Sequence, residues 1–269
     1  SNHQYMTPRN LVVLPFCLFL LLLCACSEEE QSTYTTIQGV LPPDMEEAYI
    51  NYDGEWEELL IAAEGRFIDT LPITLPRYVQ HSFGDYITRA YFTPGDQVSV
   101  SIDSVLSFGG SNAAINDYLY QVYQDDLVQE EVEYESHDRI FNLNETEYIR
   151  YRDSIKTVKL DRLAQLPAGT EAFQDFHQKD ILFDHQYDIA RYPNYYSFFY
   201  QDYEPTELIT DFYKGVPLDN EAYAKNYSPY CSLVDLILYK QIDDIMVDTA
   251  ASMLEAHLSV IQDILSPTI

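Results

Sequence analysis

The stretch YFTPGDQVSVSID, residues 91–103, decides how the first part of the chain folds. Pro94 fixes φ at the first central position of a tight turn, and Gly95 supplies the positive φ that the second position needs. Beyond the turn, apolar and polar residues alternate from Gln97 to Ile102, which is typical of a half-buried β-strand. The stretch therefore predicts a strand that starts directly after a tight turn.

Strand-like segments continue on the N-terminal side of this turn. From about Tyr34 to Ile102 they are rich in β-branched and aromatic residues. The segments are TYTTIQGVL, AYINY, RFIDTLPI, YVQHSF and YITRAYF. With turn residues about every eight to twelve positions, we expect roughly six to eight short strands, which is typical of an antiparallel β-sandwich.

From Ser111 the apolar residues follow the period of an α-helix, with Ser111 or Asn112 as its cap. The residues that share its apolar face are Ile115, Leu119, Val122 and Tyr123. Asn144 followed by Glu147 resembles a capping box for a second helix. Further helices are predicted from Thr170 to just before Pro193, from Ser228, and over about residues 249–265.

The N-terminus has the features of an exported lipoprotein. Residues 11–25 are apolar or proline and follow Arg9, and this run is shorter than the roughly 18 residues that a spanning helix needs. Its end, LCAC, resembles a bacterial lipobox, in which the last cysteine is lipidated and becomes the new N-terminus. Cys26 fits this role, whereas Cys24 does not, because bulky Leu23 would stand at the cleavage site.

The acidic residues after the lipobox indicate where in the cell envelope the protein is located. Ser27–Glu30, SEEE, resembles the export signal that sends lipoproteins of the Bacteroidetes to the outer face of the outer membrane. The alternative is a plain solvated tether. We therefore expect an outer membrane lipoprotein, displayed on the cell surface or facing the periplasm.

These features divide the chain into four segments and predict an α+β fold. Residues 1–25 are the signal peptide and residues 26–33 the acidic tether. An N-terminal antiparallel β-sandwich-like domain spans residues 34–106, and a helical region follows over residues 107–269.

The charge of the chain excludes some partners. It carries 44 acidic and 15 basic side chains, a formal net charge of -29. Nucleic acid and anionic membrane surfaces would be repelled, so neither is an expected partner. The acidic residues are interleaved with apolar ones, which favours a folded chain over a disordered one.

One predicted helix carries a possible metal site. His177, Asp180, Asp184 and Asp188 recur every three or four residues and so share a helix face, with His185 beside them. Imidazole and carboxylate groups suit zinc or a harder ion. Acidic faces are ordinary in so negative a chain, however, so we expect a solvated face and no bound metal.

An aromatic cluster spans residues 191–213, where tyrosine combines an apolar ring with a polar tip. Tyr195, Tyr196 and Tyr200 are the candidate ligand-binding residues, and core packing of part of the cluster is the alternative. Cys231 lies on the apolar face of a predicted helix, and we expect a buried, unreactive thiol there. No nucleophile elbow, phosphate-binding loop or dinucleotide-binding motif occurs in the sequence, so no catalytic residue or cofactor is expected.

Several short motifs occur in a characteristic order along the chain. They are Gly65-Arg66-Phe67, Pro94-Gly95-Asp96, and Phe108-Gly109-Gly110-Ser111-Asn112 with Asn116. In this order they resemble the N-terminal region of Bacteroidetes TlpA-like thiol:disulfide oxidoreductase lipoproteins, over roughly residues 36–265. The resemblance implies a strand-rich domain followed by helices. It carries over no catalytic residue, because that family does its redox work with a Trp-Cys-x-x-Cys in a following thioredoxin-like domain.

The expected function is that of a non-catalytic, lipid-anchored extracytoplasmic module that positions a redox domain or another partner. No thioredoxin-like domain precedes Ile269, and whether one follows stays open. The alternative is a surface lipoprotein that binds a glycan or peptide through the tyrosine cluster. A hydrolase or metal-dependent enzyme is the third alternative. The expected partners are the membrane, through the lipid, and a protein or glycan.

Overall fold

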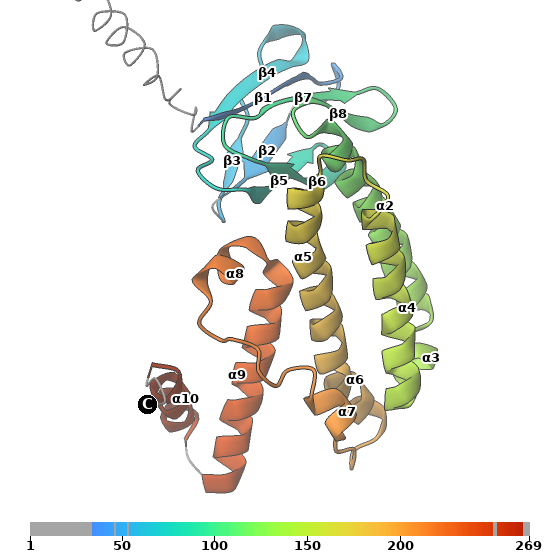
Figure 1. Ribbon diagram of the computed structural model, residues 1–269, viewed down its shortest axis with the longest axis vertical. Coiled ribbons are helices and arrows are strands. Elements are labelled where there is room, and N and C mark those ends of the chain that lie inside the picture. Colours follow the sequence, from blue (N-terminus) through green and yellow to red (C-terminus); the bar gives the residue numbers. More distant parts are fainter. Residues whose placement is uncertain (1–33, 46, 53, 250–251, 266–269) are drawn as a thin grey trace, which may run out of the picture.

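A computed structural model of the chain describes residues 34–45, 47–52, 54–249 and 252–265. The predicted signal peptide, the lipidation site Cys26 and the acidic tether lie outside these described residues. Within them, no helix has the length and apolar character needed to cross a membrane. Strands occupy one end of the molecule and helices the other (Figure 1).

The described residues contain eight strands in two sheets. In chain order they are β1 (Thr35–Val40), β2 (Ala48–Asn51), β3 (Trp56–Glu58), β4 (Arg66–Leu71), β5 (Arg77–Phe83), β6 (Tyr86–Phe92), β7 (Gln97–Ile102) and β8 (Leu106–Gly110), with a short 3-10 turn, η1 (Ala63–Gly65), before β4. The first sheet has the order β4-β1-β7-β8 and the second β3-β2-β5-β6. The predicted fold class is confirmed, with one exception to its antiparallel pairing: β1 and β7 run parallel.

The turn at Pro94 carries the chain from the second sheet to the first. Gly95 has φ +84°, and the Thr93 amide donates to the Asp96 carboxylate at 2.6 Å. The same carboxylate accepts from the Asn112 side chain, also at 2.6 Å, so it ties the turn to the start of the first long helix. The turn thus connects strands of different sheets, and this crossing brings β7 alongside β1 in a parallel direction.

The core of the sandwich lies between the two sheets. Along β7, Val98, Val100 and Ile102 are buried and the residues between them are more exposed, as the alternation predicts. Phe67 of the first sheet faces Phe83 of the second, with ring centroids 5.8 Å apart. Each such side chain, when fully buried, stabilises the fold by roughly 1.5–3 kcal/mol.

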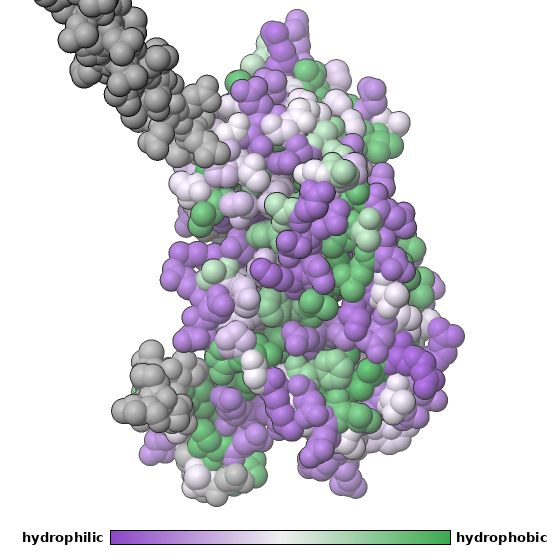
Figure 2. All heavy atoms as spheres, viewed as in Figure 1, coloured by the Kyte–Doolittle hydropathy of each residue, from purple (hydrophilic) through white to green (hydrophobic). Residues whose placement is uncertain are grey.

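Helices fill the rest of the chain. They are α2 (Ala113–Glu135), α3 (His137–Phe141), α4 (Glu145–Leu163), α5 (Glu171–Ala190), α6 (Tyr192–Phe199), α7 (Glu207–Thr210), α8 (Glu221–Asn226), α9 (Ser228–Thr249) and α10 (Met253–Leu265). Helix α2 packs on β6 and β8, α5 packs against both α4 and α9, and α10 lies on α9 (Figure 1). Hydrophilic side chains cover much of the visible surface, and hydrophobic ones gather mainly over the helices away from the sandwich (Figure 2).

Some predicted boundaries differ from the structure. The capping box of Asn144 and Glu147 is confirmed at the start of α4. Asn112 precedes α2 in a left-handed conformation with no cap hydrogen bond from its side chain, because that side chain binds Asp96 instead. Strand β8 runs to Gly110, beyond residue 106. Helix α9 continues to Thr249, so the last helix begins later than predicted.

The buried histidine of the sandwich predicts a loss of stability in mild acid. His81 packs against Phe83 and Phe92, and burial lowers its pKa from 6.5 to about 3. Below pH 6.5 the unfolded chain therefore takes up a proton that the folded chain does not, so stability falls as the pH falls. Between pH 7 and pH 5 this linkage costs about 2 kcal/mol. Urea unfolding measures the free energy of unfolding at both pH values. Between pH 7 and pH 5 this free energy should fall by about 2 kcal/mol less in His81→Leu than in the wild type.

The matched control for this measurement is Val79→Ala, two residues before His81 on the same buried face of β5. It removes apolar atoms but no titratable group, so its stability should fall between the two pH values by as much as that of the wild type. A His81→Leu variant that loses as much stability as the wild type over the same interval contradicts the prediction.

Candidate functional site

The face predicted on α5 is buried at three of its five candidate residues and half-buried at Asp184 and Asp188, so the expectation that it is solvated is wrong. His177, Asp180 and His185 are all less than a tenth exposed. Because α5 is packed against α4 and α9 and abuts the second sheet, neighbouring elements cover most of its surface. Each candidate metal ligand has a partner on a neighbouring element; the pairs are His177 with Tyr78, Asp180 with Arg89, Asp184 with Lys159, His185 with Asp153, and Asp188 with Arg152.

Through these pairs, the candidate metal ligands connect α5 to neighbouring elements of the fold. Among the described residues, no group of three or more histidine, cysteine or acidic side chains is arranged to hold a metal ion. The partners come from distant parts of the chain: Arg89 precedes Asp180 by 91 residues. The sequence offered one signal of this pairing. The strand segment YITRAYF contains a lone arginine, Arg89, and this arginine needs an anion near the outer face of its sheet.

Four residues form a joint between the sandwich and the helices. Arg89 of β6 donates to the Asp180 carboxylate of α5, and its guanidinium lies over the Tyr78 ring at 4.2 Å from the centroid. The Tyr78 hydroxyl of β5 lies 2.6 Å from Nδ1 of His177. We call Tyr78, Arg89, His177 and Asp180 the joint. It links β5, a central strand of the second sheet, and the edge strand β6 to one helix.

Burial fixes the protonation states within the joint. Burial lowers the pKa of His177 well below 6.5, and the nearby charges of Arg89 and Lys159 lower it further, so the imidazole is neutral. Burial raises the pKa of Tyr78 well above 10, so the phenol keeps its proton. The Tyr78 hydroxyl and Nδ1 of His177 share a hydrogen bond of 2.6 Å, and a neutral phenol can donate or accept in it. The imidazole proton is on Nε2 when the phenol donates and on Nδ1 when the phenol accepts.

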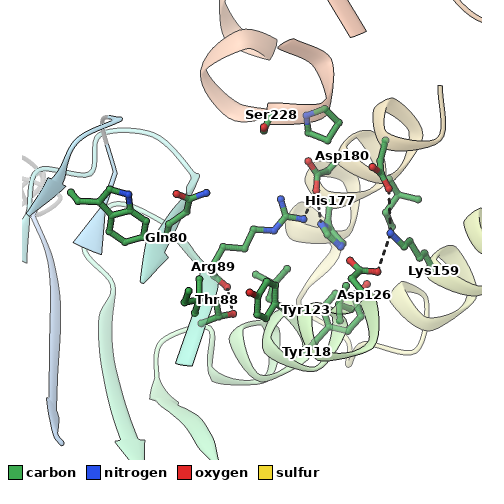
Figure 3. A pocket seen from close by; sticks show the side chains of 17 residues that line it. Gln80, Thr88, Arg89, Tyr118, Tyr123, Asp126, Lys159, His177, Asp180 and Ser228 are labelled. Atoms are coloured by element: carbon green, nitrogen blue, oxygen red, sulfur yellow. Dashed lines mark hydrogen bonds and ion pairs between the residues drawn. The ribbon is translucent and has the colours of Figure 1, made fainter. Parts of the chain in front are cut away.

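A pocket of about 450 Å³ opens beside the joint. Its walls come from β3, β5, β6, α2, α4, α5 and the first residues of α9 (Figure 3). Lys159 of α4 reaches across it and pairs with Asp126 at 3.1 Å and Asp184 at 3.2 Å. Burial alone would lower the pKa of Lys159, but these two carboxylates outweigh it and raise the pKa, so the ammonium stays charged.

Three residues that line this pocket each have a buried polar atom without a partner. Tyr118 Oη, His177 Nε2 and Asp180 Oδ1 have no hydrogen-bond partner among the residues that the structure describes. Their side chains come from α2 and α5 and converge on one region of the pocket (Figure 3). Most buried polar atoms in proteins are hydrogen-bonded, so a water or a ligand group is needed at each of these positions.

The tyrosines predicted to bind a ligand lie at the far end of the helical region. Tyr195 stacks on Phe141 with ring centroids 4.3 Å apart, and Tyr196 stacks on Tyr200 at 4.4 Å. The structure thus brings the three candidates together on and just after α6, partly exposed, and away from the joint pocket. Phe198, which sequence reasoning did not single out, is the most exposed ring of this group at 84%. We call Tyr195, Phe198, Phe199 and Tyr200 the aromatic end patch.

Cys231 is only partly buried, so the prediction of a buried thiol is corrected. Its Sγ faces α8 and donates to the Ala224 carbonyl at 3.3 Å, because Cys231 lies at the edge of the apolar face of α9. Burial raises the pKa of this thiol, which keeps it protonated near neutral pH.

Comparisons with known proteins do not identify a family for this chain. No protein-family model matches the chain, and neither a curated protein nor a solved structure matches it. The resemblance to the TlpA-like lipoproteins therefore stays a prediction.

The joint predicts a specific loss of stability. Asp180→Ala leaves the Arg89 guanidinium without its carboxylate and should lower the free energy of unfolding by roughly 2–3 kcal/mol. This is less than the usual cost of breaking a fully buried pair, because the Arg89 side chain keeps 31% of its exposure. Urea unfolding measures the change.

Asp184→Ala is the matched control, one turn further along α5. Its carboxylate is 42% exposed and shares Lys159 with Asp126, so the loss should be below about 1 kcal/mol. Equal losses in the two variants would show that the joint is no stronger than a surface pair.

Proposed function

We propose that this chain is a non-catalytic, lipid-anchored extracytoplasmic module that positions a partner at a fixed place relative to the outer membrane. The observation that carries the proposal is the joint, because it connects the sandwich to the helices through an ion pair and a hydrogen bond. In the family that the sequence resembles, the positioned partner is a thioredoxin-like redox domain.

The arrangement of the two regions suits this role. Tyr34, the first described residue, follows Cys26 by eight positions, and eight residues span at most about 28 Å. The sandwich therefore lies close to the proposed anchor. Helix α9 runs away from the sandwich, and its C-terminal end lies at the opposite end of the long axis of the molecule, with α10 packed on α9 (Figure 1). A partner held there is kept away from the membrane surface.

The state of the reactive groups agrees with a positioning role. The charged residues of α5 that sequence reasoning considered as ligands are engaged in contacts between elements. The pKa of the Cys231 thiol is raised by burial, which disfavours the thiolate that redox chemistry uses.

A second candidate function is supported by the aromatic end patch. A surface lipoprotein that binds a glycan or peptide needs exposed rings with polar tips, and Tyr195 and Tyr200 are 36% and 45% exposed. Binding to a glycan array and a peptide library, compared between the wild type and a Tyr195→Ala, Tyr196→Ala, Tyr200→Ala variant, tests this function. Absence of binding in the wild type rules it out.

Anchoring predicts a clear result in cell fractionation. Cys26→Ala should leave an unacylated protein that no longer fractionates with membranes, because the thiol that carries the lipid is gone. Cys24→Ala is the matched control and should stay membrane-bound, since Cys24 is removed with the signal peptide. Membrane fractionation of the Cys26→Ala protein would refute the proposed anchor.

The link to a redox domain has its own test. The gene beyond the Ile269 codon should encode an in-frame Trp-Cys-x-x-Cys motif if the partner belongs to the same chain. A stop codon there removes the redox domain from the proposal and requires a separate partner protein.

A further inference from the structure

The joint pocket has a donor and acceptor pattern that the positioning role does not use. His177 Nε2 is a donor in one tautomer of the imidazole and an acceptor in the other. Asp180 Oδ1 is an acceptor, because the other oxygen of this carboxylate binds Arg89. Tyr118 Oη can donate and accept. All three side chains are more than nine-tenths buried and belong to residues that line the pocket.

The charges around the pocket exclude an anionic ligand. Its lining includes the carboxylates of Asp126, Asp180 and Asp184, and only two cations, Arg89 and Lys159. Both cations are already paired with these carboxylates. A phosphate or carboxylate ligand would therefore meet a repulsive field with no unpaired cation to offset it.

A cationic ligand fits only part of the pattern. An ammonium group has donors and no acceptor, so it satisfies Asp180 Oδ1 but leaves His177 unpaired in the tautomer that carries its proton on Nε2, whereas a hydroxyl serves either tautomer. An unpaired buried donor costs about 1–3 kcal/mol. A hydroxyl group donates and accepts at once, and adjacent hydroxyls can satisfy all three atoms together.

We propose that the joint pocket binds a neutral polyhydroxylated molecule of the size of a monosaccharide. The volume of about 450 Å³ lies within the usual range for small-ligand sites. Trp56 lines the same pocket and offers an apolar ring face for the C–H face of a sugar. This site is distinct from the aromatic end patch and does not depend on the lipid anchor or on a redox partner.

The binding experiment uses a panel of neutral hexoses, N-acetylhexosamines and their disaccharides, titrated calorimetrically into the purified protein. Glucosamine and glucuronate are the charged counterparts of the same ring. At least one neutral sugar should bind saturably with one site per chain, and more tightly than both charged counterparts. If no neutral sugar binds, or if a charged counterpart binds more tightly, the proposal fails.

Tyr118→Phe locates the site. The variant removes only a hydroxyl that has no protein partner, so the fold should be kept, and the affinity should fall by about three- to ten-fold. Tyr134→Phe, at an exposed position on the same helix, is the matched control and should bind as the wild type does. An unchanged affinity in Tyr118→Phe overturns the assignment, and a loss caused by Tyr200→Ala instead would place the sugar at the aromatic end patch.

Discussion

The ion pair between Arg89 and Asp180 is the contact on which the arrangement of the two regions depends. A two-sheet sandwich buries its inner faces by itself, and apolar burial alone has no preferred direction. The outer face of the second sheet carries Arg89, whose charge needs an anion within reach. Asp180 supplies it from α5, and the adjacent contact of Tyr78 with His177 adds a second directional bond. Together they fix where the helix meets the sheet.

Local structure could be predicted from the sequence because its signals are local. The alternation from Gln97 to Ile102 and the capping box of Asn144 and Glu147 each depend on residues within a few positions of one another. The strand order could not be predicted in this way. Nothing within the TPGD turn indicates that the strands on its two sides belong to different sheets. The sheet to which β7 belongs depends on its pairing with β1, which lies far away in the sequence.

The candidate site was found in part and interpreted wrongly. Helical spacing correctly placed His177 and Asp180 on one face, but spacing does not show what covers that face. The chain has a net charge of -29, so acidic residues are common in it, and the sequence does not indicate which of them are buried. Tyr118 was overlooked for a similar reason: the chain has 24 tyrosines, and only the three-dimensional packing shows that the hydroxyl of Tyr118 is buried without a partner among the described residues.

The parallel pairing of β1 with β7 also bears on the order of folding. Thr36 pairs with Gln97, 61 residues later, whereas β4 can join β1 much sooner. As the chain is synthesised, a β1–β4 ladder therefore has an open edge until β7 emerges. Such non-local closure slows folding, and open strand edges favour association with other chains. The Pro94 turn presents β7 to that edge, so the nascent sheet stays open to association until the chain beyond this turn has been synthesised and β7 has paired with β1.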